Sequence, residues 1–188
     1  MSTGVLDLMR HGDTGQKSYR GQNDDPLTAI GWQQARAAVA GREWDAVLSS
    51  SLVRCAAFAR ELAAQRGLPL VLDARLMEYH FGAWQGVPIA DIAAREGAAL
   101  GRFWADPVAH PPPGAEPHAA FRARLTTALD DALARWPGQR VLVVTHGGAI
   151  RLLRCLVEQR GYGEMASLEV PNASIYRLPW PASAAGAA

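Results

Sequence analysis

Short apolar runs alternate with segments of helical periodicity along this chain, and that alternation limits its fold more than any other feature. The runs at residues 5–9, 46–48, 70–72 and 141–144 predict buried strands, and a last strand is expected at about 173–178. Because strands that are apolar throughout are typical of parallel sheets covered on both faces, a mostly parallel central sheet is expected. The sequence therefore predicts an α/β fold, a three-layer α/β/α sandwich.

Segments of helical spacing fill the stretches between these strands. They are predicted over residues 27–41, from residue 52 to a stop at Gly67, over 88–100, after Pro117, and from the glycines at 147 and 148 to about residue 158. Residues 73–86 are rich in aromatic side chains and are expected to be irregular. The proline-rich stretch 106–117 is expected to be a loop.

Length and charge narrow the classes of function. The 188 residues are expected to form a single domain, 1–188, with a small-residue tail from about 180 to 188 that frays. With 19 basic and 18 acidic residues, the formal net charge of +1 gives no reason to expect nucleic acid or a membrane surface as a partner. No apolar run is long enough to span a membrane, and residues 1–10 do not resemble a signal peptide. A cytoplasmic protein is therefore expected.

Three polar clusters follow predicted strands, at the edge where parallel sheets form their binding sites. Arg10-His11-Gly12 follows the first strand, Ser49 to Arg54 the second, and Thr145-His146-Gly147-Gly148 the fourth. The paired glycines at the start of a helix favour a bound anion. The clusters are therefore expected to meet at one anion site, with the rings of His11 and His146 less than about 10 Å apart.

Glu78 adds a carboxyl group from the aromatic stretch 75–86, a setting in which it could act as an acid. Two histidines could also bind a metal ion, but their neighbours are arginines, and a positive pocket repels cations. No metal and no cofactor are therefore expected, and the G-x-G-x-x-G pattern of dinucleotide sites is absent. Cys55 and Cys155 lack both metal-ligand and disulfide spacing and are expected to be free thiols.

The order of these motifs resembles the histidine phosphatase superfamily, the phosphoglycerate-mutase-like group. The resemblance extends from about Leu6 to Arg177. Several blocks are similar to the α-ribazole phosphatase branch of cobalamin biosynthesis: Tyr19-Arg20-Gly21 with Asp25-Pro26-Leu27-Thr28, Gly31-Trp32-Gln33-Gln34-Ala35, Phe81-Gly82-Ala83-Trp84-Gln85-Gly86, and the segment from Val144 to Arg151.

The resemblance implies a role for each matching residue. His11 would be the nucleophile that accepts the phosphoryl group as a phosphohistidine, and Glu78 would protonate the leaving alkoxide and then activate water. Arg10, Arg54 and His146 would hold the phosphoryl oxygens, and the positive field would keep His11 neutral. Further candidates for substrate binding are Thr14, Arg20, Gly21 and Gly147.

The implied function is the metal-independent hydrolysis of a small phosphate ester, with α-ribazole 5′-phosphate as the first candidate substrate. The alternatives are a phosphoglycerate mutase, a broad-specificity small-molecule phosphatase and a non-catalytic phosphate-binding module. Lys17, where mutases usually carry asparagine, and the short segment between Glu78 and His146 disfavour a mutase. The complete set of motif residues disfavours a non-catalytic module, and a homodimer is left open.

The remaining histidines are outside these motifs. His80 is expected either to border the site or to be structural. His110 and His118, which flank the proline-rich loop, are expected to be solvated.

Overall fold

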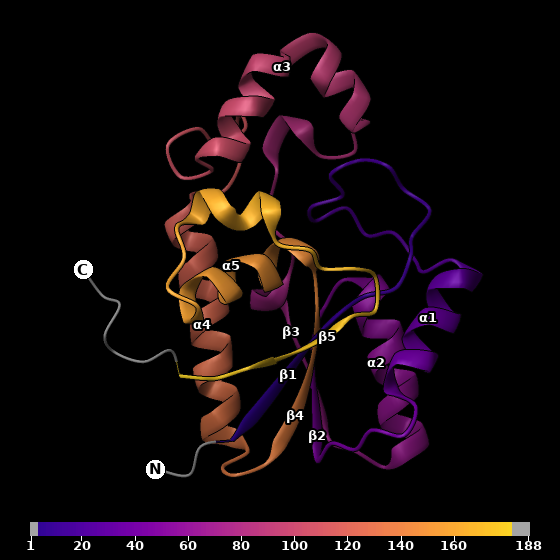
Figure 1. Ribbon diagram of the computed structural model, residues 1–188. Coiled ribbons are helices and arrows are strands. Elements are labelled where there is room, and N and C mark those ends of the chain that lie inside the picture. The colour runs from indigo at the N-terminus through magenta and orange to yellow at the C-terminus, as the bar shows by residue number, and fades with distance from the viewer. Residues whose placement is uncertain (1–3, 182–188) are drawn as a thin grey trace.

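The computed structural model describes residues 4–181, and its centre is a five-stranded sheet in the order β3-β2-β4-β1-β5 (Figure 1). The strands are β1 (Val5–Arg10), β2 (Ala46–Ser50), β3 (Leu70–Asp73), β4 (Arg140–Thr145) and β5 (Ile175–Leu178). The first four are parallel to one another, and β5 pairs antiparallel with β1. The predicted α/β fold with a mostly parallel sheet is confirmed.

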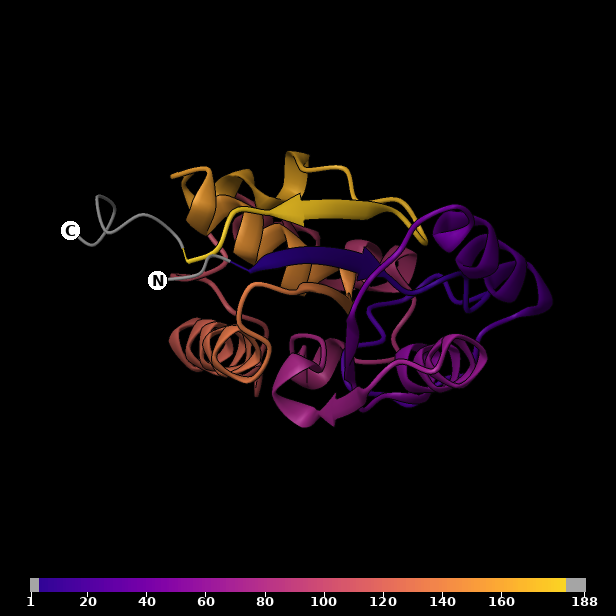
Figure 2. The same ribbon diagram turned by 90° about the horizontal axis from the view of Figure 1, so that it is seen from below.

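Helices cover both faces of the sheet (Figures 1 and 2). One face packs against α1 (Ala29–Val39) and α2 (Val53–Arg66), and the other against α4 (His118–Arg135) and α5 (Gly147–Val157). Successive residues of β4 alternate between the two cores: Val143 belongs to the α4–α5 side and Val144 to the α1–α2 side. This alternation explains why the strand is apolar throughout. No helix within residues 4–181 has the length and apolarity needed to span a bilayer.

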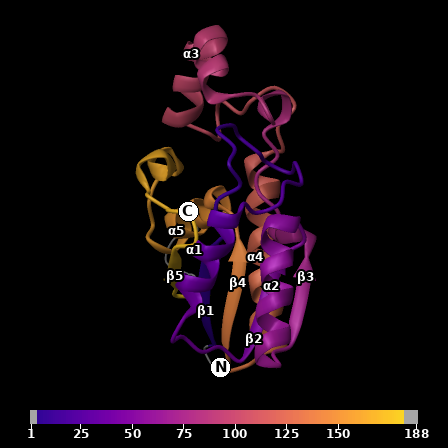
Figure 3. The same cartoon turned by 90° about the vertical axis from the view of Figure 1, so that its right-hand side faces the viewer.

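The helix α3 (Ile89–Ala105) stands beyond the carboxyl ends of β1 and β4, away from the sandwich (Figure 3). The prediction of 88–100 was five residues too short at its carboxyl end. The reason is tertiary: Phe103 is buried and packs edge-on against Trp84, with ring centroids 5.6 Å apart, so the helix continues past Gly101. This helix and the loops beside it cover the edge of the sheet at which a site was expected.

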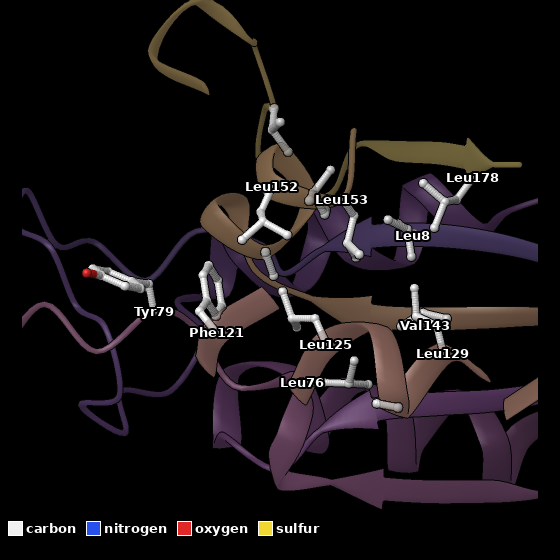
Figure 4. Packing of buried hydrophobic residues seen from close by; sticks show 14 of the residues in the cluster. Leu8, Leu76, Tyr79, Phe121, Leu125, Leu129, Val143, Leu152, Leu153 and Leu178 are labelled. Carbon is white, nitrogen blue, oxygen red and sulfur yellow. The ribbon is translucent and has the colours of Figure 1, made fainter. Parts of the chain in front are cut away.

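The stretch predicted to be irregular contains two short 3₁₀ helices, η1 (Ala74–Leu76) and η2 (Gly82–Trp84). Leu76 is fully buried among Leu125, Leu129 and Val143, whereas Tyr79 lies at the outer end of the same cluster (Figure 4). Because Leu76 is anchored in the core, the residues that follow it, including Glu78, leave the core at the edge of the sheet.

A third 3₁₀ helix, η3 (Tyr162–Ser167), was not predicted. The tail expected to fray from about residue 180 begins with an anchored residue: Trp180 is 7% exposed, and its indole Nε1–H donates to Asp130 at 2.8 Å. The rest of that tail, from residue 182 onward, lies outside the described residues.

Candidate active site

The carboxyl ends of β1 and β4 lie side by side and bring two histidines together. Arg10 is in register with Thr145, and the backbone N–H of His11 donates to the Thr145 carbonyl at 3.0 Å. The ring centroids of His11 and His146 are 5.3 Å apart, well inside the expected limit. Parallel pairing of the two strands therefore places the two residues side by side.

A cavity of about 380 Å³ opens at this edge. Of the residues predicted for the site, it is lined by Arg10, His11, Thr14, Arg20, Gly21, Arg54, Glu78 and Gly147. His146 is fully buried and does not line the cavity. Eight of the nine predicted residues therefore line one cavity, and the ninth, His146, is buried next to residues that line it.

The ring of His11 faces the cavity with a free nitrogen. Its Nδ1 lies 2.7 Å from the Gly12 carbonyl oxygen. A carbonyl can only accept, so Nδ1 carries the proton and Nε2 keeps its lone pair. Burial of the ring, reinforced by the Arg54 guanidinium, lowers the pKa of His11 to about 3. The imidazole is therefore neutral at physiological pH, the state that a nucleophile needs.

Gly12 is required by a close approach of two backbones. A Cβ at this position would collide with the backbone of Gly31, in the first turn of α1. The glycine therefore allows the start of α1 to pack directly beside the loop that carries His11.

His146 is held from both sides of its ring. Its Nδ1 accepts from Arg54 Nε at 3.2 Å, so Nε2 carries the proton and donates to Ser50 Oγ at 2.8 Å. Complete burial and the adjacent Arg54 charge hold the pKa of His146 well below its ordinary value. Both ring nitrogens therefore have partners within the protein, and neither faces the cavity.

Arg54 is locked between a helix and a distant loop. Its Nη1 and Nη2 donate to the carbonyls of Asn23 and Gly21, each at 2.6 Å. Leu52 at the start of α2 has no side-chain oxygen to cap the helix, and Asp24 Oδ1 accepts from the Val53 N–H instead, at 2.6 Å. The loop at 21–24 thus caps α2 and also orients the guanidinium group of Arg54.

Arg151 joins Arg10 at the cavity and was missed from the sequence. Arg10 Nη1 donates to Val170 O at 2.6 Å, and Arg151 Nε donates to Leu168 O at 2.9 Å. Arg10 Nε is buried and has no hydrogen-bond partner in the part of the chain that the structure describes. Burial, with Arg151 and Arg54 nearby, lowers the pKa of Arg10. Arg151 lies one helical turn after Gly147, and this spacing is the signal that could have identified it.

The carboxyl group of Glu78, which belongs to the aromatic stretch 75–86, accepts hydrogen bonds from three backbone N–H groups. Its Oε2 accepts from the Gly148 N–H at 2.8 Å, and Oε1 accepts from the N–H groups of Ala149 and Tyr79 at 3.1 and 2.9 Å. The carboxyl group therefore occupies the N-terminus of α5, where the helix dipole favours an anion. A Cβ at Gly148 would lie 2.5 Å from Oε1, so this glycine makes room for the carboxyl group.

Arg124 of α4 holds the backbone that carries Glu78 and was also missed. Its Nη2 donates to the Glu78 carbonyl at 2.8 Å, and its Nη1 donates to the Arg75 carbonyl at 2.7 Å. An ion pair with Glu116 at 2.8 Å fixes the guanidinium. A lone arginine on a helix gives no sequence signal for this role.

Arg20 lines the cavity but is already paired. Its Nε and Nη2 donate to the two carboxylate oxygens of Asp25 at 2.7 and 2.8 Å, so its charge is largely compensated. His80 does not line the cavity; its Nδ1 accepts from the Gly82 N–H at 3.1 Å. The expectation that His118 is solvated is wrong, because this side chain is 9% exposed and lines the cavity.

The charges around the cavity suit an anion. Arg10, Arg54 and Arg151 outnumber the single carboxylate of Glu78, since Arg20 is neutralised. Among residues 4–181 no group of three or more His, Cys, Asp or Glu side chains could hold a metal ion. The arrangement can bind a phosphate group and present an unprotonated imidazole nitrogen to it.

Acidification is expected to destabilise the fold through His11. The unfolded histidine takes up a proton below about pH 6.5, whereas the folded one does so only near 3, so the unfolded state binds more protons between these values. The free energy of unfolding should therefore fall as the pH falls. For His11 the loss between pH 6.5 and 5 is up to about 2 kcal/mol.

Urea unfolding of the wild type and of His11→Gln at pH 7 and pH 5 measures this contribution. The variant should lose less stability on acidification, whereas the exposed control His110→Gln should behave as the wild type does. Equal losses in the wild type and His11→Gln would show that His11 titrates at its ordinary value.

Known proteins are similar to this chain in sequence and in fold. Residues 6–185 match the sequence model of the histidine phosphatase superfamily (branch 1). A bifunctional protein of Mycobacterium tuberculosis is 34% identical over 175 residues, an alignment that covers 89% of this chain and 48% of that protein. The chain therefore spans about half the length of the mycobacterial relatives that it matches.

Two solved structures extend the comparison. The mycobacterial glucosyl-3-phosphoglycerate phosphatase superposes with a TM-score of 0.82 at 29% identity, covering 93% of this chain and 89% of that chain. The α-ribazole phosphatase of Shigella flexneri superposes with a TM-score of 0.76 at 27% identity, covering 92% and 89%.

Proposed function

Because this chain belongs to the histidine phosphatase superfamily (branch 1), we propose that it hydrolyses small phosphate monoesters through a phosphohistidine, without a metal ion. One observation carries the proposal: the free Nε2 of His11 borders a cavity in which Arg10, Arg54 and Arg151 supply positive charge. Phosphoryl transfer depends mainly on positioning and on charge neutralisation, and these groups can supply both.

In the first step Nε2 of His11 attacks phosphorus, and the bond from phosphorus to the ester oxygen breaks. The electron pair of that bond goes to the leaving oxygen, which takes a proton from the Glu78 carboxyl group. Arg10 is suited to bind a phosphoryl oxygen through Nε, which is buried and has no partner among residues 4–181. In the second step water attacks phosphorus, Glu78 accepts its proton, and the bond to His11 breaks.

Glu78 is suited to both directions of proton transfer. A dianionic ester beside its carboxyl group favours the protonated form, since two like charges repel. After the alkoxide has left with the proton, the N–H groups of Gly148 and Ala149 stabilise the carboxylate, which is then ready to act as a base.

In this proposal the role of His146 is to position Arg54. Its Nδ1 holds Arg54 through the 3.2 Å hydrogen bond. To bind a phosphoryl oxygen itself, His146 would have to carry a proton at Nδ1 and release Arg54 Nε, and the neutral tautomer in which Nε2 accepts from the Ser50 hydroxyl meets this need. The negative charge of the bound ester favours that exchange, which would add a donor to the phosphoryl group.

We infer that the substrate is α-ribazole 5′-phosphate. This ester joins phosphate to a sugar hydroxyl, and the sugar carries an aromatic base. Aromatic residues also line the cavity, among them Tyr19, Phe81 and Trp104, and such walls suit an aromatic base. The similarity to the Shigella flexneri α-ribazole phosphatase supports the same choice.

The purified protein is expected to release phosphate from α-ribazole 5′-phosphate in the presence of excess EDTA, at the rate seen without it. Arginine side chains supply the charge that a metal would otherwise supply. Phosphate release is measured for this ester and for 3-phosphoglycerate under identical conditions.

Loss of activity in EDTA, with recovery on adding Mg²⁺ or Zn²⁺, would reject the metal-independent mechanism. Efficient turnover of 3-phosphoglycerate to 2-phosphoglycerate without net phosphate release would instead make the protein a mutase. Hydrolysis of other esters but not of α-ribazole 5′-phosphate would reject only the substrate.

A further inference from the structure

Besides Arg10 Nε, two buried polar atoms of cavity-lining residues have no hydrogen-bond partner among residues 4–181. They are the hydroxyl of Tyr79 and Nε2 of His118, in side chains that are 5% and 9% exposed. An unpaired buried polar group costs free energy, so its presence in a folded protein points to a ligand or a water that completes it. Neither atom takes part in the phosphoryl transfer described above.

The Tyr79 hydroxyl projects from a continuous aromatic wall. Its ring packs edge-on against Phe81 at 5.0 Å and tilted against Phe121 at 5.2 Å. Phe81 in turn stacks on Tyr19 at 4.6 Å. In Figure 4 the hydroxyl oxygen of Tyr79 lies at the end of the ring that points away from Phe121 and the packed core. The aromatic faces therefore support a polar atom that they do not themselves satisfy.

His118 enters the same cavity from the first turn of α4, where its ring packs against Tyr162 with centroids 4.3 Å apart. Burial lowers the pKa of His118, so the ring is neutral at physiological pH. Burial raises the pKa of Tyr79 to about 12, which keeps its hydroxyl a proton donor. An uncharged ligand suits this pair better than an anionic one.

We propose that Tyr79 and His118 form the polar edge of an aromatic subsite, which binds a planar ring with a hydrogen-bonding atom in the leaving group of the substrate. The inference rests on the proposed phosphatase function and adds the residues that select the leaving group. The rings of Tyr19, Phe81 and Phe121 contribute apolar contact, and the two polar atoms orient the bound ring.

A matched pair of esters tests the subsite. α-Ribazole 5′-phosphate and ribose 5-phosphate share the same leaving 5′-oxygen, and only the first carries an aromatic ring. Because burial of an apolar ring is favourable, the wild-type kcat/KM should favour α-ribazole 5′-phosphate by at least about tenfold.

The variants Tyr79→Phe and His118→Leu remove one polar atom each. Each is expected to lower the ratio of the two kcat/KM values roughly three- to tenfold, the effect of one lost hydrogen bond. The controls Tyr176→Phe and His110→Leu change the same residue types away from the cavity and should leave the ratio as in the wild type. Tyr79→Phe preserves the ring packing, so it remains informative if His118→Leu does not fold.

Calorimetric binding of the unphosphorylated nucleoside α-ribazole to His11→Ala separates this inference from the proposed function. If no ester is hydrolysed but the nucleoside binds and Tyr79→Phe weakens binding, the subsite stands and the phosphatase proposal fails. If both esters are hydrolysed equally and Tyr79→Phe alters neither the ratio nor nucleoside binding, the subsite is overturned, and water is the partner of the two atoms. Failure of both hydrolysis and nucleoside binding rejects both proposals.

Discussion

Replacement of His11 by alanine is expected to abolish phosphoenzyme formation and to lower the rate of ester hydrolysis by about 10⁴-fold or more, as loss of a nucleophile does elsewhere. The reason is the geometry of its ring: Gly12 holds the proton on Nδ1, which leaves Nε2 as an unprotonated nitrogen in the cavity. The other histidine at this edge, His146, has both nitrogens engaged by Arg54 and Ser50 and cannot replace it.

The measurement is rapid quench with a ³²P-labelled ester, followed by acid- and base-stability of the labelled protein, because phosphohistidine survives base and is lost in acid. His110→Ala serves as the matched control, since that histidine is exposed and does not line the cavity. Labelling of His11→Ala at the wild-type level would show that another residue is the nucleophile.

Replacement of Glu78 by glutamine is expected to slow the burst-phase phosphorylation by α-ribazole 5′-phosphate by about 10²–10⁴-fold, the usual contribution of general acid catalysis. With 4-nitrophenyl phosphate the loss should be at least about tenfold smaller, because nitrophenolate leaves without a proton. The amide of glutamine cannot donate its proton to an alkoxide as a carboxyl group can.

Burst-phase rates are needed because Glu78 is also proposed as the base of the second step, and steady-state rates would mix the two roles. Glu61→Gln is the control, since that carboxylate pairs with Arg36 on the surface of the α1–α2 layer. Equal burst-phase losses with both esters would mean that Glu78 is structural and that another group at the cavity is the acid.

Several features of this protein follow from local sequence. Uniformly apolar runs predicted the buried strands of a mostly parallel sheet, because each strand packs against helices on both faces of the sheet. The motifs at residues 10–12 and 145–148 begin at the last residues of β1 and β4, so parallel pairing brings their histidines side by side. Such predictions succeed because they depend on chain direction and strand position rather than on side-chain packing.

Other features depend on residues that only folding brings together. Arg124 reaches Glu78 across 46 residues of chain, and Asp24 caps a helix that begins 29 residues later. The carboxyl group of Glu78 accepts from N–H groups in the first turn of α5, about 70 residues further along the chain. The burial of His118 results from packing against Tyr162, 44 residues away. A hydrogen bond or a buried contact requires two specific groups in one place, and no local pattern records where the second group lies.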